Sequence, residues 1–77
     1  MLFIRRLRRL RDLREDSDLT QRDIADILKT SPQYYQKYEN GVRPVPMDRI
    51  IKLAEYYNTS VDYILGLTDI KTPYPKK

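Results

Sequence analysis

A short predicted helix over residues 31–40 carries three side chains, Gln33, Tyr34 and Lys37, on one face. Glutamine donates and accepts hydrogen bonds, lysine donates them, and tyrosine combines an apolar ring with a hydroxyl. These groups suit the base edges of the DNA major groove, where glutamine pairs with adenine and lysine with guanine, and where Tyr34 would touch a thymine methyl group or a phosphate. The alternative is an ordinary solvated helix face, so the interpretation depends on the elements that hold this helix.

Both ends of the helix are marked in the sequence. Ser31 can cap the first turn with its hydroxyl, and Pro32 stands where a proline loses no helical hydrogen bond. The pair Asn40-Gly41 supplies a left-handed residue that ends the helix. On the opposite face Tyr35 and Tyr38 are three residues apart, and we expect both rings to be buried.

A second short helix, residues 20–28, lies directly upstream, and only Lys29 and Thr30 separate the two. It opens with a capping box in which Asp23 replaces the preferred glutamate or glutamine. Two short helices joined this tightly predict a helix-turn-helix. Gln21 stands in the first turn of the upstream helix, beside backbone N–H groups that favour a phosphate.

Three further stretches have apolar residues at helical spacing. We expect these helices at residues 2–16, 47–57 and 60–66, with a proline-containing connector at residues 42–46. No stretch reads as a convincing strand. The sequence therefore predicts an all-α fold of five short helices, with a domain at residues 1–66 and a mostly irregular tail at residues 67–77.

Arg14 falls on the edge of the apolar stripe of the first predicted helix, where a charge needs a partner. Glu39, at the end of the helix over residues 31–40, is the candidate carboxylate. A bidentate pair between them would tie the two helices together. The alternative, that both side chains are solvated, stays open at this point.

The composition limits the chemistry available to this chain. It has 77 residues, a formal net charge of +4 and a pI of about 9.5, but no histidine or cysteine. The commonest general base and the usual metal ligands are missing, so we expect no enzyme activity and neither a metal nor another cofactor. The excess of basic over acidic residues suits a polyanionic partner. No apolar run could cross a bilayer and no signal peptide is recognisable, which predicts a cytoplasmic protein.

Most of the chain, from about Leu7 to Asp69, carries a recognisable set of motifs. They are Leu19-Thr20-Gln21, Ile24-Ala25, Leu28, Ser31, Tyr38-Glu39-Asn40-Gly41, Arg43, Leu53-Ala54 and Ser60-Val61-Asp62-Tyr63-Ile64-Leu65-Gly66. Together they resemble the Cro/CI-type helix-turn-helix family, also called the XRE family, of phage and bacterial repressors. The tail is similar to that of short stand-alone members common in Gram-positive bacteria and their mobile elements.

The resemblance implies a compact lambda-repressor-like DNA-binding domain. In that family Gln21 would bond a phosphate and brace the second helix of the motif, and Arg14 and Glu39 would match an inter-helix ion pair. The resemblance also implies base contacts from Gln33, Tyr34 and Lys37, a position at the groove's lip for Pro32, and backbone contacts from Thr30, Ser31, Asn40 and Arg43.

The turn of the motif departs from the family pattern. Lys29-Thr30 stands where a glycine and an aliphatic residue are usual. A left-handed residue other than glycine costs roughly 1 kcal/mol, so we expect this turn to be altered or strained. Pro32 also replaces what is a polar contact in many relatives.

These observations predict a regulator of transcription that binds double-stranded DNA. They favour a repressor that occludes a promoter over an activator. We expect a homodimer on a near-palindromic operator, with an apolar patch of Tyr63, Leu67 and Ile70 as a dimer contact. The alternative is a protein-interaction module, antitoxin-like or a phage factor, in which the apolar N-terminus at residues 2–4 and the same C-terminal patch would bind a protein partner. A third reading, with the basic first helix lying on an anionic membrane, is weaker because acidic residues interrupt its basic face.

Overall fold

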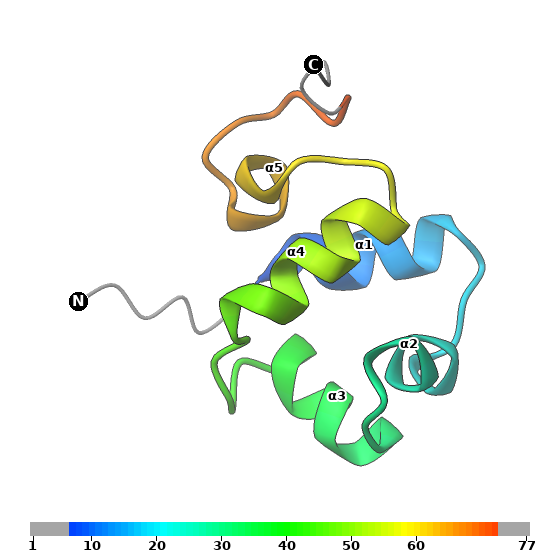
Figure 1. Ribbon diagram of the computed structural model, residues 1–77. Helices are drawn as coiled ribbons and strands as arrows, with labels where there is room; N and C mark the ends of the chain where they lie inside the picture. Colours follow the sequence, from blue (N-terminus) through cyan, green and yellow to red (C-terminus); the bar gives the residue numbers. More distant parts are fainter. Residues whose placement is uncertain (1–6, 73–77) are drawn as a thin grey trace.

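The computed structural model describes residues 7–72, and within them the chain forms α-helices and no strand (Figure 1). The helices are α1 (Arg8–Asp16), α2 (Gln21–Leu28), α3 (Pro32–Glu39), α4 (Met47–Tyr56) and α5 (Val61–Leu65). The predicted all-α fold of five short helices is confirmed.

Helix α1 is shorter than its apolar periodicity predicts. Residues 2–6 lie outside the described part of the chain, and Leu7 has φ −95° and ψ 83°, which is not helical. No side chain caps the helix start, and the carbonyl of Leu7 instead accepts a hydrogen bond from the N–H of Leu10 at 3.0 Å. The helix therefore begins at Arg8, and the side chain of Leu7, just before it, is buried in the core.

Short-range signals set most of the other helix boundaries. The hydroxyl of Ser60 accepts a hydrogen bond from the N–H of Tyr63 at 3.0 Å and so caps α5. Gly66 (φ 80°) ends α5, and Asn58 (φ 55°) follows α4, both in the left-handed region that stops a helix. These stops keep each helix short and let the chain turn back on itself.

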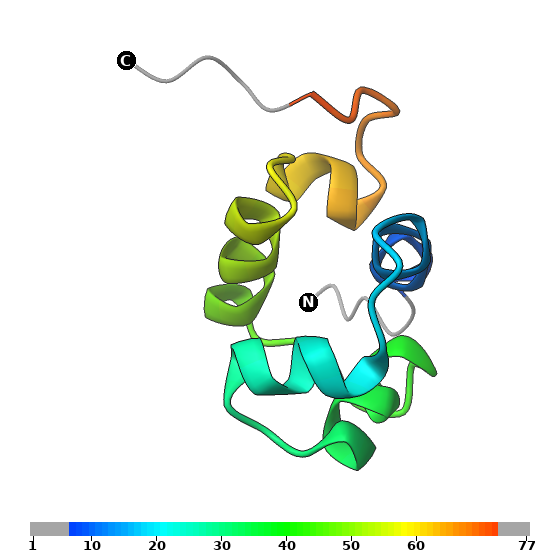
Figure 2. The same cartoon turned by 90° about the vertical axis from the view of Figure 1, so that its right-hand side faces the viewer.

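One core joins all five helices. In Figure 2, α1 is seen almost end-on, and α2, α4 and α5 surround the space that the core side chains fill. The two buried tyrosines of α3 are the bulkiest members of this core. Its buried apolar residues are Leu7, Leu10, Leu13, Ile24, Ala25, Leu28, Tyr35, Tyr38, Ile50, Leu53, Ala54 and Ile64.

The segment after α5, residues 67–72, has no helix or strand but is bonded to the helical body. We call it the C-terminal strap. The guanidinium of Arg9 donates to the carbonyls of Tyr63, at 2.9 Å, and Thr68, and it pairs with Asp69 at 2.6 Å. The hydroxyl of Thr59 donates to the carbonyl of Lys71 at 2.5 Å. The irregular backbone of the strap is therefore held at two points.

Arg9 also covers part of the patch that the sequence suggested for dimer contact. Its guanidinium lies 4.1 Å from the centroid of the Tyr63 ring, and Tyr63 is half-buried. Tyr63 is thus not part of an exposed patch, because a cation stacks on its face. Leu67 and Ile70 remain 72% and 66% exposed.

Candidate nucleic-acid interface

Helices α2 and α3 pack against each other and form the helix-turn-helix (Figure 1). The capping box at the start of α2 is present despite its aspartate: the N–H of Asp23 donates to the Thr20 hydroxyl at 3.1 Å, and the N–H of Thr20 donates to the Asp23 carboxylate at 2.8 Å. Hydrogen bonding of the Asp23 carboxylate to the backbone N–H of Thr20, and to its side chain, lowers the pKa of Asp23. The start of α2 is therefore held in one geometry.

The cap at the start of α3 also forms. The N–H of Tyr34 donates to the hydroxyl of Ser31 at 3.1 Å, and Pro32 occupies the first turn. After α3, Gly41 has φ 76° and the N–H of Val42 returns to the carbonyl of Lys37 at 2.9 Å. Of the pair Asn40-Gly41, it is Gly41 that adopts the left-handed conformation.

One face of α3 is buried and the opposite face is polar. Tyr35 and Tyr38 are buried as predicted. The exposed side chains follow the spacing i, i+3, i+4 and i+7 of a single helix face. We call this surface the reading face, and its residues are Gln33, Gln36, Lys37 and Asn40.

Two residues lie differently from their predicted places. Gln36 was not among the residues predicted to face a partner, although its spacing of three from Gln33 would have identified it. Tyr34 is half-buried at the edge of the reading face, because its ring packs edge-on against Tyr38 at 5.3 Å. The guanidinium of Arg43 lies 5.9 Å from the centre of the Tyr34 ring, which places the loop after α3 beside the helix.

A buried ion pair holds α3 against α1. Arg14 Nε donates to Glu39 Oε2 at 2.7 Å, and Arg14 Nη2 donates to Glu39 Oε1 at 3.1 Å. Arg14 Nη1 also donates to the carbonyl of Leu19 at 3.0 Å, just before α2. The predicted bidentate pair is thus present, and the solvated alternative is wrong, since the Glu39 side chain is only 2% exposed.

Gln21 joins the same network. Its Nε2 donates to Glu39 Oε1 at 3.2 Å, so the first turn of α2 is bonded to the last turn of α3. Burial of Glu39 raises its pKa, but hydrogen bonds, above all that from Arg14, lower it more, and the net pKa is below the usual value. The carboxylate therefore stays charged and fixes the angle between the two helices of the motif.

Two buried tyrosine hydroxyls lie in the core without a hydrogen bond to any described residue. They belong to Tyr35 and Tyr57. Burial raises the pKa of both hydroxyls; direct interaction with the Glu39 carboxylate raises that of Tyr35 further, and the negative charge of Glu39 raises that of Tyr57. Both side chains therefore stay neutral and contribute to the core mainly through their rings.

Four cations lie on α2, on α3 or in the adjoining turns: Arg22, Lys29, Lys37 and Arg43. All four are exposed, and none forms an ion pair with a residue between 7 and 72. Their charges are available to an outside partner.

The predicted contact residues at the turn differ in exposure. Thr30 and Pro32 are half-buried, whereas Ser31 is exposed and keeps its hydroxyl proton free to donate.

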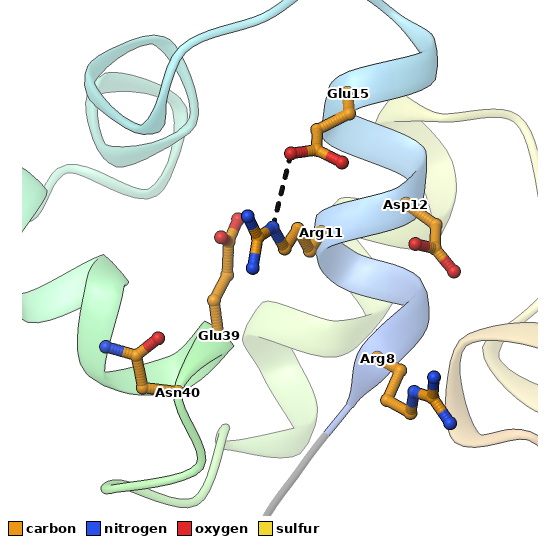
Figure 3. A pocket seen from close by; sticks show the side chains of 6 residues that line it. All are labelled: Arg8, Arg11, Asp12, Glu15, Glu39 and Asn40. Carbon is orange, nitrogen blue, oxygen red and sulfur yellow. Dashed lines mark hydrogen bonds and ion pairs between the residues drawn. The ribbon is translucent and has the colours of Figure 1, made fainter.

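A polar pocket of about 300 Å³ lies between α1 and the end of α3 (Figure 3). Its lining mixes both signs of charge: Arg11 is paired with Glu15 at 3.2 Å, Asp12 points to the other side of α1, and Asn40 follows the last residue of α3. This mixture does not concentrate one sign of charge. The unpaired cations of the helix-turn-helix offer a better site for an anionic partner.

Other kinds of site find less support in the structure. Among residues 7–72 there is no group of three or more acidic, histidine or cysteine side chains that could hold a metal ion. No helix in this part of the chain is both long and apolar enough to span a membrane.

The fold and the site together define a helix-turn-helix domain. Residues 10–64 match the sequence profile of a helix-turn-helix family, and the chain belongs to that family, of the Cro/CI or XRE type. It is similar to the uncharacterized HTH-type transcriptional regulator YobD of Bacillus subtilis, with 42% identity over 65 residues, 84% of this chain and 58% of the relative.

More distant relatives include named regulators. The HTH-type transcriptional regulator ImmR of Bacillus subtilis is 32% identical over 63 residues, covering 82% of this chain and 50% of that protein. The cryptic phage CTXphi transcriptional repressor RstR of Vibrio cholerae is 30% identical over 53 residues, covering 69% of this chain and 48% of that protein. The chain thus spans about half the length of these relatives. No solved structure matches it.

Proposed function

We propose that this protein binds double-stranded DNA sequence-specifically and represses transcription by occluding a promoter. The observation that carries the proposal is the polar reading face of α3, which includes Lys37, is held by a buried ion pair and lies in a motif with three further unpaired cations. In a helix-turn-helix the second helix lies in the major groove and the first crosses the backbone. The names of its relatives, which include a transcriptional repressor, support the regulatory role.

Each part of the site has a role in this proposal. Gln33 and Lys37 read base edges, and Tyr34, at the edge of the face, touches a thymine methyl group or a phosphate. Gln21 uses one N–H on Glu39 and keeps the other for a phosphate. The remaining contacts to the groove's lip and the DNA backbone come from Pro32, Thr30, Ser31, Asn40 and Arg43.

The protein acts as a symmetric dimer in this proposal. A dimer would place two copies of α3 in successive major grooves, on half-sites roughly 34 Å apart. The exposed Leu67 and Ile70 on the strap supply apolar surface for the contact between copies. Occupation of such a site is itself enough to block polymerase.

The test selects binding sites from a random duplex library and then measures affinity for the selected site. Q33A and K37A should each weaken specific binding by about 5-fold to 150-fold, the equivalent of about 1 to 3 kcal/mol per base contact. Lys52, exposed on α4 and so outside the helix-turn-helix, provides the control K52A, which should bind like wild type. Failure of the wild-type protein to retain duplex DNA at low salt would refute the proposal.

The protein-interaction alternative gives a different result in the same assay. Its predicted apolar N-terminus at residues 2–4 lies outside the described residues, and Leu67 and Ile70 are its remaining support. A heterologous partner whose binding is unaffected by Q33A and K37A, together with no selected DNA site, would favour this alternative.

A further inference from the structure

The turn between α2 and α3 contains a residue in an unfavourable backbone conformation. Lys29 has φ 57° and ψ 46°, the left-handed region. Glycine enters this region freely and asparagine tolerates it, but a lysine has a Cβ that approaches the following carbonyl oxygen and no short polar group to compensate. The turn would form at lower cost with another residue.

The side chain of Lys29 makes no contact among the described residues that would offset this backbone strain. It is exposed, and it forms no hydrogen bond or ion pair with any residue from 7 to 72. Its backbone N–H donates to the carbonyl of Asp26 at 3.2 Å, yet the Asp26 carboxylate does not pair with its ammonium group. Local electrostatics within the turn therefore do not explain a lysine here.

The helix dipoles do not explain it either. A cation at the end of α2 is stabilised by the carbonyl end of that helix. Ser31 caps the start of α3 only two residues later, however, and the N–H end of α3 repels a cation. The two effects oppose each other at Lys29.

The position of Lys29 suggests what the lysine gains. It follows the last residue of α2, the helix that would cross the DNA backbone, and precedes by two residues the cap of α3, which would enter the major groove. Figure 1 shows the short turn that joins these two helices. It directly precedes Thr30 and Ser31, both assigned above to the DNA backbone. An exposed lysine with no ion pair among residues 7–72 thus stands in the segment where contacts to phosphates are expected.

We propose that Lys29 contacts a DNA phosphate, and that this contact offsets the strain of its left-handed backbone. The inference rests on the proposed function, because it needs duplex DNA on this face. It adds a residue outside the predicted contact set. The left-handed Lys29 would then lower the stability of the free protein and raise its affinity for DNA.

The experiment measures binding of a mixed-sequence 30-base-pair duplex by fluorescence anisotropy between 50 and 200 mM salt, because a phosphate contact needs no particular sequence. The variants are K29N and K29G, which suit the left-handed turn but lack the charge, and K29R, which keeps it. K52Q removes one positive charge from α4 and controls for net charge. Thermal unfolding is followed for each.

The slope of log affinity against log salt should become less negative by about 0.9 in K29N and K29G, the amount expected for one phosphate. If the curves converge at 1 M salt, affinity at 0.1 M falls about eightfold. K29R and K52Q should keep the wild-type slope. The unfolding midpoints of K29N and K29G should equal or exceed that of wild type, because the strain is relieved.

A K29N slope equal to that of K52Q would overturn the phosphate contact, and so would loss of binding in a folded K29R. Midpoints of both K29N and K29G below that of wild type would overturn the strain argument. If the wild-type protein itself shows no salt-dependent duplex binding, the proposed function fails as well. Binding by wild type with an unchanged K29N refutes this inference alone.

Discussion

Replacing Arg14 by methionine tests what holds the helix-turn-helix together. Methionine keeps much of the apolar stem of arginine but removes the two bonds to Glu39, at 2.7 and 3.1 Å, and the bond to the carbonyl of Leu19. The Glu39 carboxylate, 2% exposed, would keep the hydrogen bond from Gln21 at 3.2 Å and its interaction with the Tyr35 hydroxyl, but neither partner carries a charge. R14M therefore leaves a buried charge without its counter-ion.

The magnitude follows from this burial. Removing one partner of a buried ion pair costs about 3 to 5 kcal/mol, because the remaining charge is desolvated and unpaired. A chain of 77 residues has a total stability of about 4 to 12 kcal/mol, at roughly 0.05 to 0.15 kcal/mol per residue. We expect R14M to lose at least about a quarter of the free energy of unfolding at pH 7.

The cost should depend on pH in a defined direction. In the wild-type protein, burial raises the pKa of Glu39, but the hydrogen bonds led by that from Arg14 lower it more, to below its usual 4.5. The pair's stabilisation is thus complete above about pH 4.5 and is lost as the pH falls through the folded pKa. In R14M burial prevails and raises the pKa of Glu39, so the penalty is largest at pH 7 and shrinks as Glu39 takes up a proton.

Urea unfolding followed by circular dichroism, at pH 7 and pH 5, measures these differences. The control is R11M, which breaks the exposed Arg11–Glu15 pair (64% and 53% exposed) and should cost less than about 1 kcal/mol. The double variant R14M/E39Q removes the buried charge and should be more stable than R14M. The reasoning is refuted if R14M costs no more than R11M at pH 7, or if its cost is the same at both pH values.

Two further predictions concern the core and the strap. Y57F should raise the free energy of unfolding by about 1 kcal/mol in the same urea assay, because the buried Tyr57 hydroxyl lacks a hydrogen bond to any described residue; a clear loss of stability would show that the hydroxyl has a partner. R9A should speed chymotryptic cleavage after Leu67 and lower stability by about 1 to 2 kcal/mol, since it removes two carbonyl bonds and the stacking on Tyr63. D69N should change the cleavage rate and the stability little, because Asp69 is exposed. Equal effects of R9A and D69N on these two quantities would contradict this account.

Much of the candidate site could be predicted because its signals are local. Ser31 caps α3 and Gly41 ends it through bonds that span three to five residues. The burial of Tyr35 and Tyr38 follows from helical spacing alone. The Arg14–Glu39 pair spans 25 residues, and it could be predicted only as an open alternative until the resemblance to the family favoured it. Contacts with DNA stay predictions.

The sequence by itself determined the helices, the residues that end them and the polar side of α3. Backbone hydrogen bonding and side-chain spacing act over only a few residues, so these features are local. The tertiary structure decided the rest. Arg9 meets Tyr63, Thr68 and Asp69 across 54 to 60 residues, and no periodicity in the chain indicates that meeting. Gln21 likewise reaches Glu39, 18 residues along the chain, only because α2 and α3 pack together.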